Sequence, residues 1–404
     1  MTGYKVLDLT RILAGPYCSM ILGDLGAEII KIEHPEHGDD TRSWGPPFIN
    51  GESVYFFSVN RNKKSVCINM KHKEGSDLLR QLAAKCDILI ENFLPRTLHK
   101  YELGYQHLKE INPGLIYCSI TGYGQTGPWS LRPGYDVITS AVGGMLHITG
   151  TEEGDLDCLC DVYFVEPCKV GVAVTDLSTG LYAHGAIMAA LLHKHKTGEG
   201  QHIDCNLFST QVATLVHLGA NYLNNGIEAK RLGTAHGSIV PYEAFRTADG
   251  HLVVGAGNNS QFLNLLQMMG LEQYSEDARF KSNALRVENR STLLDILRKR
   301  FEENTTDEWS SLFEGAGFPF GPINDLSQVF KNPQIKANRL VQKMNHSTAG
   351  EIKLPGPAVQ YSKSKTILQG APPTLGQHTD EVLESVLGLD VDYLSWLRED
   401  GVIH

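Results

Sequence analysis

The chain has 404 residues, of which 42% are hydrophobic, and this indicates a buried core and more than one domain. Its formal net charge is −10 and no basic stripe is visible, so we expect no nucleic-acid partner. We expect no membrane partner either, because the apolar segment 181–192 is too short to span a bilayer and cationic residues follow it. An anionic ligand would need a local basic pocket.

Short apolar runs alternate with helical patterns in the first part of the chain. Residues 4–10 predict a buried strand, 16–25 a helix and 27–33 a second strand. The later strands are expected at 65–69, 87–91, 115–120 and 201–207, and the later helices at 74–85, 105–112, 181–196 and 209–223. This alternation predicts an α/β fold with a largely parallel sheet.

A change in pattern near residues 224–230 indicates a smaller second domain. It is expected to hold short strands at 241–247 and 252–255, followed by helices. Strand character returns at 350–361, and two helices are expected at the end of the chain. We therefore expect a large domain of residues 1–224 with 329–404, and a small domain of residues 225–328.

The stretch GVAVTDLSTG, residues 171–180, places Asp176 where an extended segment gives way to a long helix. A carboxylate there gains from the free N–H groups and the positive end of the helix dipole. Because Asp is among the commonest N-cap residues, spacing alone favours a cap over a catalytic role.

Three glycines, Gly122, Gly124 and Gly127, match the pattern G-x-G-x-x-G after an expected strand. A dinucleotide site would require a helix to begin at once, but Pro128 follows. We therefore do not expect a nicotinamide site, although a glycine turn near a ligand remains a possible role for this stretch.

Two other turns are candidates for lining a ligand site. Residues 13–16 follow the first strand, at the edge of a doubly wound sheet where ligands bind; the alternative is a tight turn with Pro16 at a helix start. Residues 255–259 follow another strand and contain two glycines. They form either a mobile loop that closes on a ligand or an ordinary turn capped by Asn259.

Lysine and arginine side chains near two strand ends are expected either to converge on phosphates or to form a solvated surface. They are Arg61, Lys63, Lys64, Lys71, Arg96 and Lys100.

The chain has eight cysteines, and three of them, Cys158, Cys160 and Cys168, lie close together in sequence. They lack paired CxxC units and a nearby His, so we expect no metal site.

The chain resembles the class III CoA-transferases, of the formyl-CoA transferase and carnitine CoA-transferase type. Matching stretches follow in order along nearly the whole chain, among them KVLDLTRILAGPY, NRNKKSVCINMK, ITGYGQTGP, VAVTDLSTG and DGHLVVGAGN. The resemblance implies a large Rossmann-like domain with a parallel sheet, built from N-terminal and C-terminal parts. It also implies a smaller α+β domain and an interlocked homodimer.

The resemblance implies that Asp176 is a nucleophile that forms an aspartyl anhydride and then an aspartyl-CoA thioester. CoA would move from an acyl-CoA, with succinyl-CoA the expected donor, to a dicarboxylate such as glutarate or hydroxymethylglutarate. Asp136 would lie beside the nucleophile. The loop with Gly255 and Gly257 would exclude water, and N–H groups there, or at Ala14 and Gly15, would hold the oxyanion.

No cofactor is expected to be bound permanently, because CoA esters and carboxylic acids are the substrates. The resemblance implies that residues from several separate stretches contact CoA. They are Ala14, His34, Ile68, Lys71, Asn92, Phe93, Lys100 and Tyr135. For the distal carboxylate of a dicarboxylate, the candidates are Arg11, Arg231 and His236. The mitochondrial matrix is the compartment implied, although the first residues predict a strand and no targeting peptide; the cytoplasm is the alternative.

Two other functions remain alternatives. An α-methylacyl-CoA racemase needs an acid/base pair, and Tyr135 stands where those family members carry a His, which favours a transferase. A non-catalytic CoA binder is expected only if the unusual, Cys-rich segment 156–170 misplaces Asp176. Leu13 replaces the Gln of formyl-CoA transferases, so oxalate-type substrates are not expected.

Overall fold

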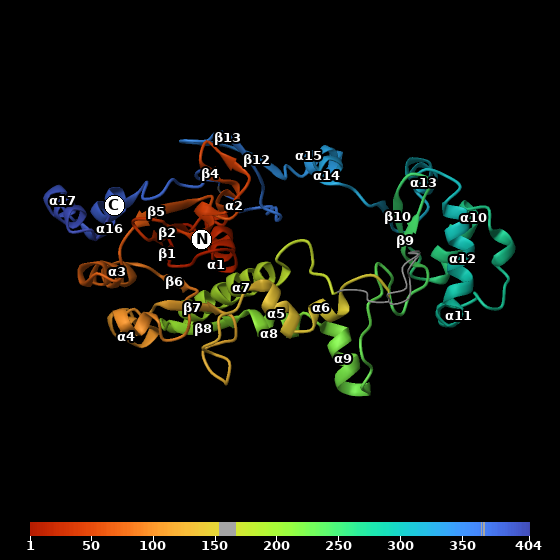
Figure 1. The fold of residues 1–404 in the computed structure, drawn as a ribbon, viewed down its shortest axis with the longest axis horizontal. Helices are drawn as coiled ribbons and strands as arrows, with labels where there is room; N and C mark the ends of the chain where they lie inside the picture. The colour runs from red at the N-terminus through yellow and green to blue at the C-terminus, as the bar shows by residue number, and fades with distance from the viewer. Residues whose placement is uncertain (153–166, 365, 367) are drawn as a thin grey trace. The chain divides into compact units, whose positions relative to one another are not determined.

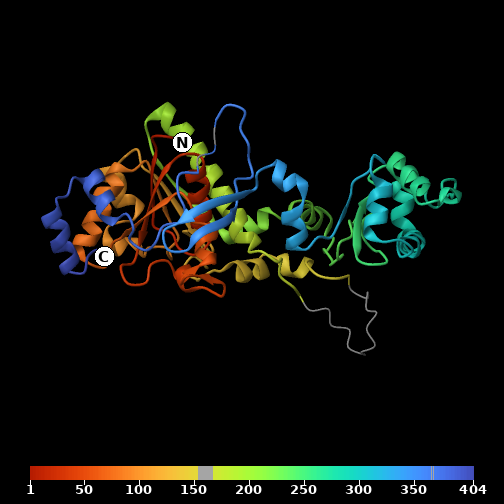
Figure 2. The same cartoon turned by 90° about the horizontal axis from the view of Figure 1, so that it is seen from above.

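The chain divides into two units in the computed structural model, which describes residues 1–152, 167–364, 366 and 368–404 (Figure 1; Figure 2). The larger unit combines Met1–Met145, Lys169–Ile227 and Lys336–His404. The smaller unit combines Leu146–Cys168 and Glu228–Ile335. The expectations for Cys158 and Cys160, and for most of segment 156–170, fall outside the described residues.

A six-stranded parallel sheet forms the centre of the larger unit, in the order β5-β2-β1-β6-β7-β8. This confirms the predicted α/β class. The register places Val6 opposite both Ile29 and Ile88, so the apolar positions of neighbouring strands align on the same face. The strands are β1 (Lys5–Asp8), β2 (Glu28–Glu33), β5 (Lys63–Cys67), β6 (Ile88–Glu91), β7 (Ile116–Thr121) and β8 (Gln201–Asn206).

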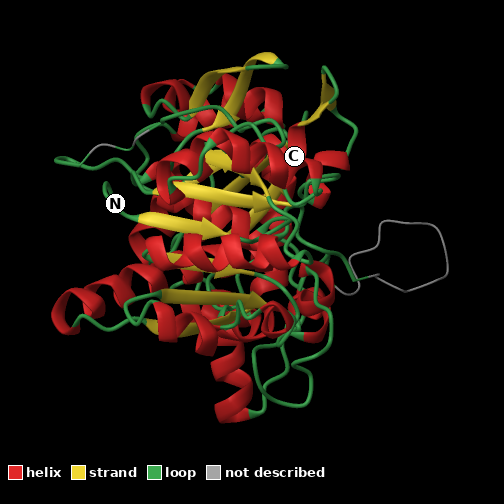
Figure 3. Cartoon of the chain, turned by 90° about the vertical axis from the view of Figure 1, so that its left-hand side faces the viewer, coloured by secondary structure: helices red, strands yellow, loops and turns green. Residues whose placement is uncertain are grey.

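Helices cover both faces of this sheet, as Figure 3 shows. Leu7 and Ile30 are buried on one face, with α3 (Lys73–Lys85), α4 (Tyr105–Ile111), α16 (Thr379–Leu387) and α17 (Val391–Glu399). Val6 and Ile29 are buried on the other face, with α1 (Ala14–Asp24) and α7 (Val174–Thr197). Because both faces are covered, the inner strands β1, β6 and β7 are largely apolar, whereas the edge strands β5 and β8 keep several polar positions.

The C-terminal part adds α16 and α17 to the larger unit, together with a hairpin of β12 (Val341–His346) and β13 (Gly350–Pro355).

One helix prediction for the larger unit is wrong in detail. The helix expected at 209–223 is two helices, α8 (Leu207–Ala213) and α9 (Val216–Asn225). The break lies at Val216, whose φ of 45° cannot continue a right-handed helix.

The smaller unit is of the α+β type that the resemblance implied. Its sheet is antiparallel, in the order β11 (Phe320–Pro322), β10 (His251–Gly255), β9 (Tyr242–Arg246). Its helices are α10 (Asn259–Met268), α11 (Asn283–Glu288), α12 (Arg290–Phe301) and α13 (Thr306–Phe313). They enclose an aromatic core in which Trp309 stacks on Phe313 with ring centroids 5.3 Å apart.

Short elements complete the described chain. They are η1 (Asp40–Ser43), β3 (Phe48–Ile49), β4 (Glu52–Ser53), α2 (Val54–Ser58), η2 (Leu98–Tyr101), α5 (Asp136–Val142), α6 (Met145–Ile148), η3 (Glu272–Tyr274), α14 (Leu326–Lys331) and α15 (Pro333–Ala337). None of the helices in the described residues is both long and apolar enough to cross a membrane.

Candidate active site

A cavity of about 320 Å³ lies in the larger unit, where β1, β6 and β7 end. Such an edge is the usual ligand-binding edge of a doubly wound sheet. Its wall includes residues singled out from the sequence, among them Arg11, Leu13, Ala14, Asn92, Phe93, Tyr135 and Asp176. The structure therefore brings these separate stretches of the chain together at one place.

Asp176 is not the N-cap of its helix, so the capping interpretation is wrong. Helix α7 begins at Val174 after the cap residue Ala173, which makes Asp176 its third residue. The cap is provided by another helix: Oδ1 of Asp136 accepts hydrogen bonds from the N–H groups of Thr175 and Asp176, at 2.8 and 3.1 Å. The Asp176 carboxylate is therefore not needed to cap α7 and lies at the wall of the cavity.

Burial changes the acidity of Asp176, whose residue is only 8% exposed. The pKa of Asp176 is raised to about 7, first because burial disfavours the charged form and second because of the nearby charge of Asp136. A carboxylate in this setting is poorly solvated and is still ionised in a large fraction of molecules at neutral pH. Both properties suit a nucleophile.

The start of α1 faces the same cavity. Ala14 and Gly15 occupy its first two positions, where N–H groups have no acceptor within the helix. Helices α1 and α7 pack closely because Gly180 has no side chain: a Cβ there would lie 2.8 Å from the carbonyl oxygen of Ala14. Two helix starts are thus brought to one cavity, and each carries partial positive charge.

The glycine-rich stretch after β7 forms a close backbone contact at the cavity wall. A Cβ on Gly122 would lie 2.9 Å from Cα of Gly134, so neither position has room for a side chain. This contact brings Tyr135 and the start of α5 beside the end of β7. No helix begins between Gly122 and Tyr135, as expected from Pro128.

A second cavity, of about 200 Å³, shares Arg11 and Phe93 with the first one. It is lined by three more of the residues predicted to contact CoA, His34, Ile68 and Lys71. The guanidinium of Arg11 lies 5.6 Å from the Phe93 ring centroid and is paired with Asp40 at 2.8 Å. Burial and the neighbouring His37 lower the pKa of His34, so this imidazole is largely neutral at physiological pH.

Several of the basic residues do not converge on a ligand, and for these the phosphate hypothesis is wrong. Arg61 is buried against Asp24 at 2.6 Å, and Lys63 against Asp8 at 3.2 Å. Lys64 pairs with two glutamates. Their positive charges are therefore neutralised by carboxylates within the unit, and Lys71 is the lysine of that set that lines the second cavity.

The remaining predicted residues line neither of these two cavities. Lys100 lies in η2 and lines neither cavity. In the smaller unit, Arg231 donates to the carbonyl of His147, and His236 stacks on Tyr242. The N–H groups of Gly255 and Gly257 bond to Pro319 and Gln261. A role for these five residues in the reaction stays a prediction.

Sequence reasoning missed Tyr55, in α2. Burial raises the pKa of its phenol, and the charges of Asp176 and then Asp136 raise it further, so the phenol lies within electrostatic reach of the candidate nucleophile. Its ring meets that of Trp44 edge-on, with centroids 5.3 Å apart. No motif marks Tyr55; its aromatic neighbours in sequence, Phe56 and Phe57, are core residues.

Comparisons with known proteins agree on one family. The sequence model of CoA-transferase family III matches residues 1–379. The human succinyl-CoA:glutarate CoA-transferase is 54% identical over 403 residues, which are 100% of this chain and 90% of that protein. The succinate–glutarate CoA-transferase of Agrobacterium fabrum is 39% identical and covers 95% of this chain; 94% of that protein is covered. A crystal structure of a CAIB/BAIF family protein from Brucella suis has a TM-score of 0.83 at 40% identity, covering 95% of this chain and 98% of that one.

Proposed function

This chain belongs to CoA-transferase family III and is a CoA-transferase, and we propose that it moves CoA from succinyl-CoA to glutarate or a closely similar dicarboxylate. The choice of acids is supported by the names of the human and Agrobacterium relatives. The observation that carries the proposal is the Asp176 carboxylate, which is buried at the wall of a cavity between the starts of two helices.

In the proposed first half-reaction, a carboxylate oxygen of Asp176 attacks the thioester carbonyl of succinyl-CoA. The carbon–sulfur bond breaks, CoA leaves as a thiolate, and a succinyl-aspartyl anhydride remains. The thiolate then attacks the Asp176 carbonyl carbon of the anhydride. Succinate leaves with the electron pair of the broken carbon–oxygen bond, and an aspartyl-CoA thioester remains.

The second half-reaction reverses these steps with the new acid. A carboxylate of glutarate attacks the aspartyl-CoA thioester and releases the thiolate, which gives a glutaryl-aspartyl anhydride. The thiolate attacks the glutaryl carbonyl, so that glutaryl-CoA leaves and the Asp176 carboxylate is regenerated. Each tetrahedral intermediate carries an oxyanion, and the N–H groups of Ala14 and Gly15 at the start of α1 are our candidates to stabilise it.

For CoA itself, we propose the second cavity and its rim, with His34, Ile68, Lys71 and Phe93 as contacts. Ala14, Asn92 and Tyr135 line the first cavity, where the thioester end would lie. Lys100 is kept as a more distant contact. Arg11 is our first candidate for the distal carboxylate, because it lines both cavities and needs only to exchange Asp40 for the substrate.

The larger unit also exposes apolar helical surface, and we propose that a second copy of the chain covers it. Helix α9 buries none of its residues within the chain, and Val216 and Leu223 are 71% and 83% exposed. Light scattering on the purified protein tests this homodimer.

A mitochondrial location is a further proposal, drawn from the resemblance, and cell fractionation tests it.

The function is tested by incubating the protein with succinyl-CoA and glutarate and separating the CoA esters. Formation of glutaryl-CoA in step with loss of succinyl-CoA supports the proposal. In deuterated water, exchange of the hydrogen next to the thioester carbonyl without a change of acid would instead support a racemase. Binding of succinyl-CoA with neither reaction would support a non-catalytic CoA binder.

A further inference from the structure

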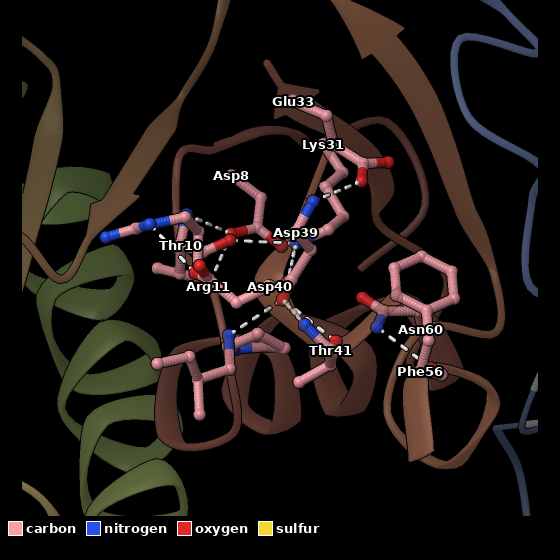
Figure 4. Close-up of polar contacts among 12 residues, drawn as sticks. Asp8, Thr10, Arg11, Lys31, Glu33, Asp39, Asp40, Thr41, Phe56 and Asn60 are labelled. Atoms are coloured by element: carbon pink, nitrogen blue, oxygen red, sulfur yellow. Dashed lines mark hydrogen bonds and ion pairs between the residues drawn. The ribbon is translucent and has the colours of Figure 1, made fainter. Parts of the chain in front are cut away.

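The turn of residues 10–12, between β1 and α1, is held by side chains from three different parts of the sheet edge. Its three consecutive backbone N–H groups donate to Asp8, Asn92 and Asp39, in that order along the turn, at 2.9, 3.0 and 3.1 Å. Figure 4 shows this cluster of polar contacts around Asp39 and Thr10. The backbone of this turn is therefore fixed by the side chains around it.

Ile12 is the residue that needs this support. Its φ is 74°, in the left-handed region that a β-branched residue rarely adopts. A residue in such a conformation persists only where its surroundings determine its geometry, and such residues concentrate at functional sites. Here the N–H of Ile12 is held by Oδ1 of Asp39, and Ile12 lines the same cavity as Asp176.

Asp39 is itself fixed by buried partners. It is 1% exposed, and its Oδ2 accepts a hydrogen bond from Nζ of Lys31 at 2.9 Å. The same ammonium donates to the carbonyl of Thr10 at 2.8 Å. The ion pair therefore contacts the backbone of the turn twice, through Lys31 at Thr10 and through Asp39 at Ile12. Burial opposes ionisation of Asp39, but Lys31 and the hydrogen bonds outweigh it and lower the pKa to about 2.

The network continues into the first turn of α1. Nζ of Lys63, also buried, donates to Oδ2 of Asp8 at 3.2 Å and to the carbonyl of Pro16 at 2.9 Å. The turn and the start of α1 therefore share one buried set of two lysines and two aspartates. A shift of the turn would move the first N–H groups of α1.

We propose that Asp39 is a positioning residue of this enzyme: it holds Ile12 in its left-handed conformation and so fixes the N–H groups of Ala14 and Gly15 relative to Asp176. This inference rests on the proposed function, because it assigns those N–H groups to the reacting carbonyl. Asp39 lines the second cavity, but it is only 1% exposed and its carboxylate oxygens accept from Ile12, Thr41 and Lys31, so no role in binding CoA is assigned to it. Its effect reaches the reaction through the backbone of Ile12.

The test compares Asp39→Asn with the double variant Asp39→Asn, Ile12→Gly. Asn keeps one side-chain oxygen, but its amide NH2 replaces the Oδ2 that accepts from Lys31, so the ion pair that anchors Oδ1 against the Ile12 N–H is lost. The single variant is expected to lower kcat for glutaryl-CoA formation by about tenfold or more, with a change of less than about threefold in the KM for glutarate. Because glycine adopts a φ of 74° without strain, the double variant is expected to recover most of kcat. A loss of stability alone gives no such recovery.

Asp24→Asn is the matched control. Asp24 is also a buried carboxylate paired with a cation, Arg61, at 2.6 Å, but it lies at the other end of α1. Its kcat is expected to stay within about twofold of the parent. If Asp39→Asn keeps the parental kcat, or if the double variant recovers none of the loss, the proposal is overturned.

Hydrogen exchange separates this inference from the proposed function. In Asp39→Asn, peptides covering residues 10–16 are expected to exchange at least about tenfold faster than in Asp24→Asn, whether or not the parent transfers CoA. Parental exchange there overturns the proposal by itself. If Asp39→Asn is insoluble, Thr41→Val replaces it, since the Thr41 hydroxyl donates to Oδ1 of Asp39 at 2.8 Å. Unchanged kcat and exchange in Thr41→Val would again overturn it.

Discussion

The carboxylate of Asp136 accepts the backbone N–H of Asp176 at 3.1 Å, so one aspartate caps the helix whose first turn carries the other. The same placement puts two negative charges close together. The Asp176 side chain is left at the cavity wall. Its pKa is raised to about 7, mainly by burial and to a smaller extent by the charge of Asp136. Capping and activation of the candidate nucleophile are therefore linked through a single residue.

Replacement of Asp176 by Asn is expected to abolish CoA transfer and to stabilise the protein at the same time. The folded-state pKa of about 7 lies above the unfolded value, so stability is lost as pH rises toward 7. The raised pKa lowers the stability of the folded protein by roughly 4 kcal/mol above about pH 7. Near pH 5 the loss is roughly 1.5 kcal/mol, because there the carboxyl group ionises in the unfolded chain but stays protonated in the folded one. Urea unfolding of both proteins near pH 8 and pH 5 measures this difference; equal stability at both pH values would contradict it.

The pH dependence of kcat/KM should follow the ionisation of Asp176. Activity is expected to rise with pH through about 7 and then to level off, because only the ionised carboxylate attacks. Asp136→Asn removes the neighbouring charge but keeps an oxygen acceptor for the helix. The rise of kcat/KM with pH should therefore occur at lower pH in this variant.

Glu91 provides the internal control for that experiment. Its pKa is also raised to about 7, by burial, but the charge that adds to this rise is that of Asp204 and not that of Asp136. If kcat/KM rises at the same pH in Asp136→Asn as in the parent, the titrating group is Glu91 or another group, and not Asp176.

Gly180→Ala should damage the site from within the helix interface. The added methyl would lie 2.8 Å from the carbonyl oxygen of Ala14 and would force α1 away from α7. We expect a loss of about 1–3 kcal/mol in stability together with a fall in kcat. Gly185→Ala, in the same helix, has nothing within 4 Å of its added Cβ and should be neutral or slightly stabilising. Similar behaviour of both variants would contradict this account of the α1–α7 contact.

Lys71→Ala should weaken the binding of the CoA ester and leave the acceptor unaffected. Lys71 lines the second cavity, where we place CoA, and its ammonium group is suited to pairing with a phosphate of that ligand. The KM for succinyl-CoA is expected to rise by about five- to tenfold, with little change in the KM for glutarate. Lys64→Ala serves as the comparison, because Lys64 is paired with Glu28 and Glu381. An equal rise in the two variants would indicate a general charge effect.

The alternation of apolar runs and helices was sufficient to predict the parallel sheet, because inner strands covered on both faces lose most of their polar positions. The sequence pattern was not sufficient to predict which residue caps α7. Asp176 has the residue type of a cap but is the third residue of the helix, and Asp136, 40 residues earlier, caps it through a tertiary contact. Spacing within one segment carries no information about an acceptor that comes from another.

The basic residues illustrate a second limit. Lys63 and Arg61 lie at the start of β5 in a cluster of basic residues that the sequence alone could not distinguish from a phosphate site, yet each is buried against an aspartate. Their partners, Asp8 and Asp24, come from β1 and α1, so only the folded arrangement pairs them. The support that Asp39 gives to Ile12 was missed for the same reason, since no local pattern predicts the left-handed conformation of Ile12.

The central claim, that Asp176 carries the CoA group during transfer, is tested most directly by the intact mass of the protein after incubation with succinyl-CoA alone. We predict an increase equal to the mass of CoA less one water, removed by hydroxylamine and absent in Asp176→Asn. The adduct should persist in Asp136→Asn, which keeps the nucleophile. An adduct that survives in Asp176→Asn, or glutaryl-CoA formation by a parent protein that never shows one, would contradict the account.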